Sequence, residues 1–198
     1  EWEKTLKGNG DAVGKMVEKG KGQFVGPEIM GKTLGVIGLG AIGLLVANAG
    51  VALGMKVVGC DPYLSVANAV KLDPRVKVVA TQDEVMAEAD YLSLHVPLMD
   101  ATKGMINADA IAKMKDGVRV VNLSRAELVN SADMIAAVEN GKVASYVTDF
   151  PSDDMIGESG VIAIPHLGAS TPESEENCAV MAAQELRSIR LGVNTRWL

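Results

Sequence analysis

A histidine and an arginine stand where side chains of their types do proton and carboxylate chemistry. His166 follows the apolar run Val161–Ile164 and precedes Leu167-Gly168, so it is predicted to lie in a loop after a strand. An imidazole there would exchange a proton with a substrate hydroxyl near neutral pH; a histidine that only caps the next helix is the alternative. Arg125 also follows an apolar run and would clamp a carboxylate bidentately, the alternative being a surface arginine before a helix.

A glycine-rich segment, Gly38-Leu39-Gly40-Ala41-Ile42-Gly43, has G-x-G-x-x-G spacing between a predicted strand and a predicted helix. This context is typical of a loop that binds the pyrophosphate of a dinucleotide at a helix N-terminus. Gly38 would permit the tight turn, Gly40 would let the backbone approach the pyrophosphate, and Gly43 would let helix and strand pack closely. An ordinary flexible turn is the alternative.

A second predicted strand, Lys56–Cys60, is followed by Asp61, which lies 23 positions after Gly38. A carboxylate at this place accepts hydrogen bonds from the adenosine ribose and repels a 2′-phosphate. The next residues, Pro62 and Tyr63, supply no arginine for such a phosphate. Together the two signals predict NAD as the cofactor, in preference to NADP.

These residues need a scaffold that brings strand ends together at one edge. From Lys32 onward short β-rich runs alternate with helical stretches, which predicts a Rossmann-type, doubly wound α/β fold with a parallel sheet of about seven strands and helices on both faces. The predicted strands are Thr33–Ile37, Lys56–Cys60, Val76–Val79, Tyr91–Leu94, Val118–Asn122, Ser145–Thr148 and Val161–Ile164. The predicted helices are Ala41–Leu53, Ser65–Leu72, Gln82–Glu88, Ala108–Lys113 and Asp133–Glu139.

The two ends of the chain have different patterns. Residues 1–22 mix apolar positions with five glycines, which predicts a broken helix followed by a linker. The last helix is predicted to have Thr171 as its N-cap and Pro172 as its first residue, and to stop at Gly192. We therefore expect the cofactor domain to occupy residues 23–192 and residues 193–198 to form a tail.

Composition argues against several classes of protein. A formal net charge of -6 with scattered basic residues disfavours binding to nucleic acid or to an anionic membrane. No apolar run approaches the roughly 20 residues that span a bilayer, and the charged N-terminus is not a signal peptide. Cys60 and Cys178 are too few for a disulfide framework, and no Cys/His cluster has metal-ligand spacing. We expect a cytoplasmic protein without a metal centre.

Four segments resemble the D-isomer-specific 2-hydroxyacid dehydrogenases, and they occur in that family's order. They are Gly31-Lys32-Thr33-Leu34-Gly35-Val36-Ile37-Gly38-Leu39-Gly40, His95-Val96-Pro97-Leu98, Val121-Asn122-Leu123-Ser124-Arg125 and Pro165-His166-Leu167-Gly168-Ala169-Ser170-Thr171. The last segment is most similar to the phosphoglycerate dehydrogenase branch. The resemblance implies NAD-dependent oxidation of a D-2-hydroxy acid, with 3-phosphoglycerate and 3-phosphohydroxypyruvate, at the start of serine biosynthesis, as the expected pair.

The resemblance also implies roles for single residues. Arg125 would bind the substrate carboxylate and carbonyl, His166 would be the general acid/base, and Asp149 would contact the nicotinamide carboxamide. The family pairs its histidine with a glutamate five residues after that aspartate, where this chain has Asp154, with Glu158 as the alternative. Arg125 and His166 are also expected to contact the cofactor. The other residues expected to contact it are Gly38, Gly40, Ala41, Ile42, Gly43, Asp61, Pro62, His95, Val96, Pro97, Thr102, Leu123, Ser124 and Gly168.

Family members carry a substrate domain of roughly 100 residues ahead of the glycine loop, and roughly thirty residues precede the strand and loop here. We expect that domain to be largely absent and the chain alone to be weakly active or inactive, because closure orients the substrate and excludes water. Family members also dimerise through the cofactor domain, which implies a homodimer. Residues 1–22 and an alanine-rich face of the last helix would form part of the dimer interface, and packing within one chain is the alternative. The alanine-rich face comprises Ala179, Ala182, Ala183 and Leu186.

Two other functions remain open. A glyoxylate or hydroxypyruvate reductase, or another 2-hydroxyacid dehydrogenase, would act on a different small acid with the same residues. An NAD-sensing, corepressor-like binding module would bind the cofactor and a partner peptide without turnover, since a fold and a site can outlive an activity.

Overall fold

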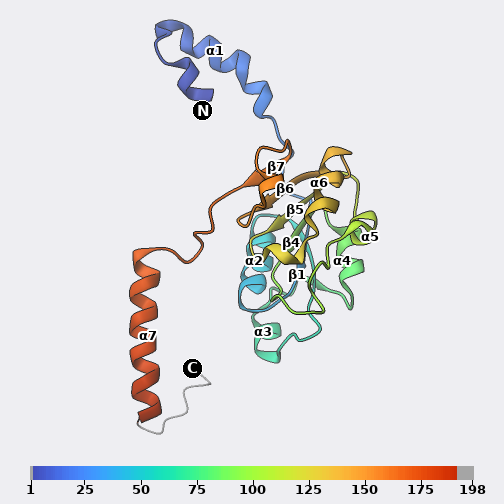
Figure 1. Ribbon diagram of the computed structural model, residues 1–198, viewed down its shortest axis with the longest axis vertical. Coiled ribbons are helices and arrows are strands. Elements are labelled where there is room, and N and C mark those ends of the chain that lie inside the picture. Colours follow the sequence, from blue (N-terminus) through green and yellow to red (C-terminus); the bar gives the residue numbers. More distant parts are fainter. Residues whose placement is uncertain (1, 191–198) are drawn as a thin grey trace.

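The alternating β-rich and helical runs produce one seven-stranded sheet, with strand order β3-β2-β1-β4-β5-β6-β7. The computed structural model describes residues 2–190 (Figure 1). Every neighbouring pair of strands is parallel. The strands are β1 Thr33–Ile37, β2 Lys56–Cys60, β3 Lys77–Val78, β4 Tyr91–Leu94, β5 Val118–Asn122, β6 Val143–Thr148 and β7 Val161–Ala163. The order reverses between β1 and β4, and ligands of open α/β sheets bind outside the carboxyl ends of the strands at such a point.

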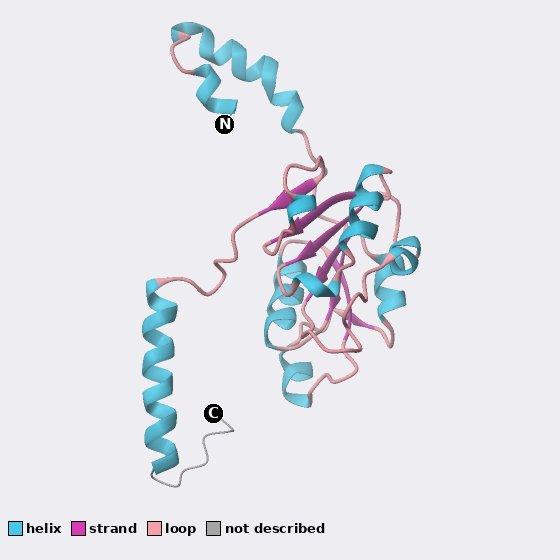
Figure 2. Cartoon of the chain, in the orientation of Figure 1, coloured by secondary structure: helices cyan, strands magenta, loops and turns pink. Residues whose placement is uncertain are grey.

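Helices connect successive strands and cover both faces of the sheet, which confirms the predicted doubly wound fold (Figure 2). They are α2 Ala41–Ala52, α3 Val66–Lys71, α4 Gln82–Glu88, α5 Ala108–Ala112 and α6 Ser131–Glu139, with the short 3₁₀ turns η4 Ala126–Leu128 and η5 Asp153–Met155. Side-chain caps define several of the helix starts. Thr81 and Glu84 form a capping box at α4, and Asn130 accepts a hydrogen bond from the Asp133 amide at α6.

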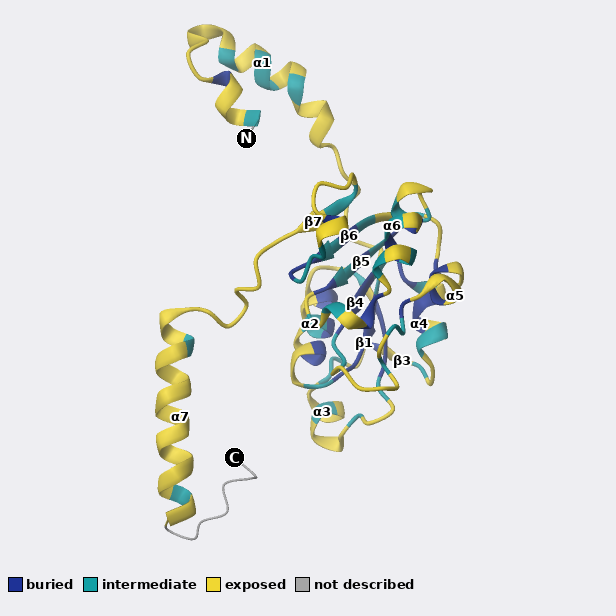
Figure 3. Ribbon diagram, viewed as in Figure 1, coloured by how far each residue is buried: buried dark blue, intermediate teal, exposed yellow. Residues whose placement is uncertain are grey.

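Two apolar cores, one on each face, hold the layers together (Figure 3). The first lies between the sheet and helices α4, α5 and α6, and includes Leu92, Met134 and Tyr146. The second lies under α2, where Ala47 and Val51 pack with residues of β1 and β2. Burying one large apolar side chain contributes about 1.5–3 kcal/mol, so these two cores stabilise the sheet on which the strand ends are held.

The two ends of the described chain extend away from this α/β body (Figure 1). Residues 2–24 form η1 Trp2–Leu6, η2 Gly10–Ala12, α1 Val13–Gly20 and η3 Lys21–Phe24, in agreement with the predicted broken helix. The C-terminal helix α7, Pro172–Arg190, begins as predicted, because Thr171 Oγ1 accepts a hydrogen bond from the Ser174 amide at 3.1 Å. None of its residues is buried. The predicted stop at Gly192 and the tail 193–198 lie outside the described residues.

No helix among residues 2–190 is long and apolar enough to cross a membrane.

Candidate functional site

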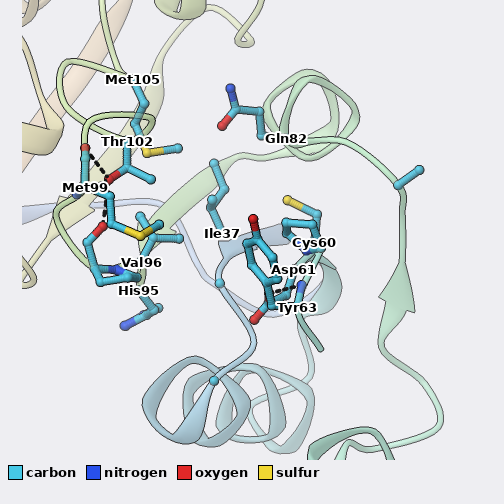
Figure 4. A pocket seen from close by; sticks show the side chains of 15 residues that line it. Ile37, Cys60, Asp61, Tyr63, Gln82, His95, Val96, Met99, Thr102 and Met105 are labelled. Carbon is cyan, nitrogen blue, oxygen red and sulfur yellow. Dashed lines mark hydrogen bonds between the residues drawn. The ribbon is translucent and has the colours of Figure 1, made fainter. Parts of the chain in front are cut away.

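A cavity of about 410 Å³ lies at the carboxyl ends of β1, β2 and β4, where the strand order reverses (Figure 4). The end of β2 forms one wall and the loop after β4 forms the other, with the start of the glycine loop between them. Its lining residues are Ile37, Gly38, Gly40, Cys60, Asp61, Pro62, Tyr63, Ala80, Gln82, His95, Val96, Pro97, Met99, Thr102 and Met105. The cavity therefore brings together the glycine loop, the acidic strand end and the His95 segment.

The three glycines of the loop are required for three different reasons. Gly38 has a φ of 92°, and a Cβ there would lie 2.4 Å from the carbonyl oxygen of His95. A Cβ at Gly43 would lie 1.8 Å from the carbonyl oxygen of Gly38, so a side chain would separate α2 from the loop. At Gly40 a Cβ would meet no protein atom within 4 Å, although this residue lines the cavity. The glycine at position 40 thus leaves open space at the N-terminus of α2, where an anionic group is stabilised.

Asp61 ties the end of β2 to the glycine loop. Its Oδ2 accepts a hydrogen bond from the Leu39 amide at 2.9 Å, and its Oδ1 accepts one from the Tyr63 amide at 2.8 Å. Each carboxylate oxygen can accept a second hydrogen bond. Asp61 is partly exposed on the cavity wall, so its free lone pairs are available to hydroxyl groups of a ligand.

The opposite wall is held by hydrogen bonds within the loop after β4. Ser93 Oγ and His95 Nε2 are hydrogen-bonded at 2.9 Å, and burial lowers the pKa of His95 below its usual value. The imidazole of His95 is therefore neutral at neutral pH. Thr102 Oγ1 donates to the Pro97 carbonyl at 2.7 Å and accepts from the Met99 amide at 2.9 Å, which fixes the shape of this wall.

Arg125 lies at the carboxyl end of β5, beside the neighbouring strand end. Asn122 Nδ2 donates to the Arg125 carbonyl at 2.8 Å, and Ser124 Oγ donates to the Leu94 carbonyl at 2.6 Å. These contacts hold the turn after β5 against β4. The exposed Arg125 guanidinium donates to the Ser124 carbonyl through Nη1 at 2.7 Å.

His166 contacts a carboxylate from the neighbouring strand end. Its Nδ1 lies 2.6 Å from Asp149 Oδ2, and the ring centroids of His166 and Phe150 are 4.2 Å apart. The Asp149 side chain is 8% exposed, whereas that of His166 is 50% exposed. Asp149 Oδ1 and Ser152 Oγ are buried without a hydrogen-bond partner among the described residues.

The carboxylate on His166 differs from the one expected. Asp154 and Glu158 are both exposed, and neither forms a hydrogen bond or ion pair with His166 within the described part of the chain. The turn η5 explains this result, because it buries Met155 and leaves the acidic residues around it at the surface. The predicted pairing with Asp154 or Glu158 is therefore replaced by a pairing with Asp149.

The cavity contains part of the predicted cofactor set and leaves the rest outside. Among the predicted residues, it is lined by Gly38, Gly40, Asp61, Pro62, His95, Val96, Pro97 and Thr102. The remaining predicted residues do not line it, namely Ala41, Ile42, Gly43, Leu123, Ser124, Arg125, Asp149, His166 and Gly168.

Sequence reasoning missed several wall residues of this cavity. Cys60, Gln82, Met99 and Met105 line it without having been singled out. Ser93, which supports His95, also escaped notice, yet residues two apart on a strand face the same side. That alternation was the available signal for Ser93.

Comparison with known proteins places the chain among dehydrogenase domains. A family described as "D-isomer specific 2-hydroxyacid dehydrogenase, NAD binding domain" matches residues 6–168. The D-3-phosphoglycerate dehydrogenase of Synechocystis sp. is 37% identical over 180 residues, which are 88% of this chain and 32% of that protein. The chain thus spans about a third of the length of the curated relatives that it matches.

Solved structures give the same result. A glyoxylate reductase from Paecilomyes thermophila superposes with a TM-score of 0.74 and 32% identity, covering 83% of this chain and 51% of that one. The NAD complex of a D-isomer-specific 2-hydroxyacid dehydrogenase from Lactobacillus delbrueckii ssp. bulgaricus superposes with a TM-score of 0.74 and 27% identity. The match covers 92% of this chain and 61% of that one.

Proposed function

Because the chain belongs to the D-isomer-specific 2-hydroxyacid dehydrogenase family through its NAD-binding domain, we propose that it serves hydride transfer between NAD and a D-2-hydroxy acid. The observation that carries this proposal is the His166–Asp149 pair at the carboxyl edge of the sheet that also holds the glycine-loop cavity. A proton-transfer group and a dinucleotide site at one sheet edge are the two parts that such a reaction needs.

The cavity residues fit a dinucleotide by their chemistry. The open space at Gly40 and the N-terminus of α2 suit the pyrophosphate, and the carboxylate of Asp61 suits the ribose hydroxyls. The apolar wall of Val96, Pro97 and Met99 suits the adenine. A dinucleotide held by these residues would supply the hydride chemistry, as acceptor during oxidation and as donor during reduction.

The chain's own residues would orient the substrate and move its proton. His166 donates through Nδ1 to Asp149, so its Nε2 is the nitrogen that takes the hydroxyl proton during oxidation and returns it during reduction. The exposed guanidinium of Arg125 binds the substrate carboxylate as a fork and orients it. We assign Leu123, Ser124 and Gly168 to the walls of the nicotinamide side, next to these two residues.

The names of the relatives support 3-phosphoglycerate and 3-phosphohydroxypyruvate as the substrate pair, a step towards serine. The similarity to a glyoxylate reductase supports glyoxylate or hydroxypyruvate as the second candidate. We also place the protein in the cytoplasm, in keeping with its two free cysteines. A homodimer through the cofactor domain is supported by exposed apolar residues on α7, among them Met181 and Leu186.

The proposal is tested by isotope transfer, which detects even slow turnover. The chain at high concentration is mixed with deuterated NADH and, in turn, with 3-phosphohydroxypyruvate, glyoxylate and hydroxypyruvate. Deuterium is expected at C2 of the D-hydroxy acid, fastest with 3-phosphohydroxypyruvate. A His166→Gln variant, measured at saturating NADH, should slow the transfer by about 10²–10⁴-fold. Glu139→Gln on the surface of α6 should leave the rate unchanged. Deuterium transfer at the same rate in His166→Gln as in the unaltered chain would overturn the hydride-transfer mechanism proposed for this site.

A further inference from the structure

We propose that Gln82 determines the base preference of the glycine-loop cavity, because its carboxamide is placed to bind the amino edge of an adenine ring. Gln82 is the first residue of α4 and lines this cavity. The inference rests on the proposed function and adds to it a residue that distinguishes adenine from other bases.

The proposed contacts of the pyrophosphate and the ribose leave one end of the cavity to the base. The pyrophosphate lies at Gly40 and the adenosine ribose at Asp61, so the base extends from Asp61 toward the far end. Figure 4 shows Asp61 and His95 at one end of the cavity, and Gln82 and Met105 at the other. An adenine ring that extends from the ribose into this cavity therefore presents an edge to Gln82.

The N-terminus of α4 holds the backbone of Gln82 in place. Thr81 Oγ1 accepts a hydrogen bond from the Glu84 amide at 3.3 Å, and Glu84 Oε1 accepts one from the Thr81 amide at 3.1 Å. Val85 and Met86, in the same helix, are buried in the core between α4 and the sheet. The Gln82 side chain is therefore carried by a helix end that is fixed beside the cavity.

The Gln82 carboxamide has a donor and an acceptor that no other residue among 2–190 occupies. The polar side chains of the opposite wall are instead engaged within the protein. His95 is hydrogen-bonded to Ser93, and the Thr102 hydroxyl both donates and accepts within its own loop. These side chains hold the shape of that wall, whereas the Gln82 carboxamide is available to a ligand.

Two further polar side chains at the cavity are less suited to the base. Burial, with two nearby carboxylates, raises the pKa of the Cys60 thiol to about 11, so the thiol is protonated at neutral pH and is only a weak donor. Tyr63 is 83% exposed, so water satisfies its hydroxyl group. Neither side chain presents a strong donor beside a strong acceptor, as the Gln82 carboxamide does.

A carboxamide and adenine are complementary in their donors and acceptors. The 6-amino group of adenine donates to the carboxamide oxygen, and the neighbouring ring nitrogen accepts from the carboxamide nitrogen. A bidentate pair of this kind discriminates between bases by about tenfold or more. Gln82 would therefore select a dinucleotide that carries a free 6-amino group.

The first test needs no variant. NAD is compared by calorimetry with nicotinamide ethenoadenine dinucleotide, in which a two-carbon bridge joins the 6-amino nitrogen to the ring and removes both amino hydrogens. The unaltered chain should bind NAD at least about tenfold more tightly. Equal affinity would overturn the contact of Gln82 with the amino edge and leave the proposed function standing. Failure to bind either dinucleotide would overturn the proposed function and this assignment with it.

The second test separates the hydrogen bonds from the larger size of the analogue. Gln82→Leu keeps a side chain of similar length without a donor or acceptor, and it should lose most of the preference through weaker binding of NAD. Tyr63→Phe is the matched control, because it removes the other unoccupied polar group of the cavity and should keep the full preference. Unfolding midpoints are recorded for both variants. A preference retained in folded Gln82→Leu, or lost in Tyr63→Phe, would overturn the assignment to Gln82.

Discussion

Alanine substitutions at two glycines of one loop are expected to separate folding from cofactor binding. At Gly43 an added Cβ would lie 1.8 Å from the Gly38 carbonyl oxygen and 3.2 Å from His95 Cβ. The first of these contacts is with backbone, so α2 and the loop must move apart. Overpacking of this kind costs about 1–3 kcal/mol, which for a chain of this size lowers the unfolding midpoint by roughly 2–12 °C.

Gly40→Ala has the opposite profile. Gly40 has φ −67° and ψ −163°, which alanine also adopts, and its Cβ would meet no protein atom within 4 Å. Replacing the glycine lowers the conformational entropy of the unfolded chain, which stabilises the folded state by about 0.4–1 kcal/mol. This stabilisation offsets the weaker capping by alanine at this N-cap. The unfolding midpoint should therefore change by no more than about 2 °C. The methyl group would, however, take the space of the pyrophosphate, so NADH affinity should fall by about tenfold or more.

Scanning calorimetry and titration with NADH on the same preparations test both variants. The expected pattern is a large loss of stability for Gly43→Ala, and a loss of affinity at unchanged stability for Gly40→Ala. Unaltered NADH affinity in Gly40→Ala would refute the assignment of this space to the pyrophosphate. A Gly43→Ala protein that unfolds at the original temperature would refute the packing argument.

Two further predictions follow from shifted pKa values. Burial, with two nearby carboxylates, raises the pKa of the Cys60 thiol to about 11. Iodoacetamide at about pH 8 should therefore modify the exposed Cys178 first, and equal rates by peptide mass spectrometry would contradict this. Although burial raises the pKa of Asp90, its hydrogen bond from the Thr33 amide and its pairing with Lys115 lower it on balance below the usual 3.8. The contribution of Asp90 to the free energy of unfolding is then complete above pH 3.8 and is lost as the pH falls further. Chemical denaturation should show that Asp90→Asn is less stable than the unaltered chain at neutral pH but not in strong acid. A stability difference that does not change with pH would contradict this.

Most of the fold could be predicted because its signals are local. The strand and helix patterns, the turn residues and the glycine loop each lie within a few residues of one another, and a parallel sheet assembles such units in a standard way. The bounds that differ have local physical reasons too. Helix α6 begins at Ser131, two residues earlier than predicted, because Asn130 caps it.

The partner of His166 could not be predicted, because a long-range contact decides it. Asp149 and His166 are 17 residues apart and meet because β6 pairs with β7. Counting along the chain points to Asp154, but the burial of Met155 in η5 fixes this turn, and Asp154 remains exposed. The strand pairing thus brings Asp149 to the imidazole, while the turn around buried Met155 leaves Asp154 at the surface.

Calorimetric titration with NADH and, separately, with NADPH tests the central claim that the cavity is an NAD site selected by Asp61. The Asp61→Asn variant is titrated alongside, and its unfolding midpoint is recorded because this carboxylate also holds the Leu39 and Tyr63 amides. We predict that NADH binds at least about tenfold more tightly than NADPH, and that the variant binds NADH more weakly and discriminates less. No binding of either dinucleotide by the folded chain, or equal binding of both, would contradict the account.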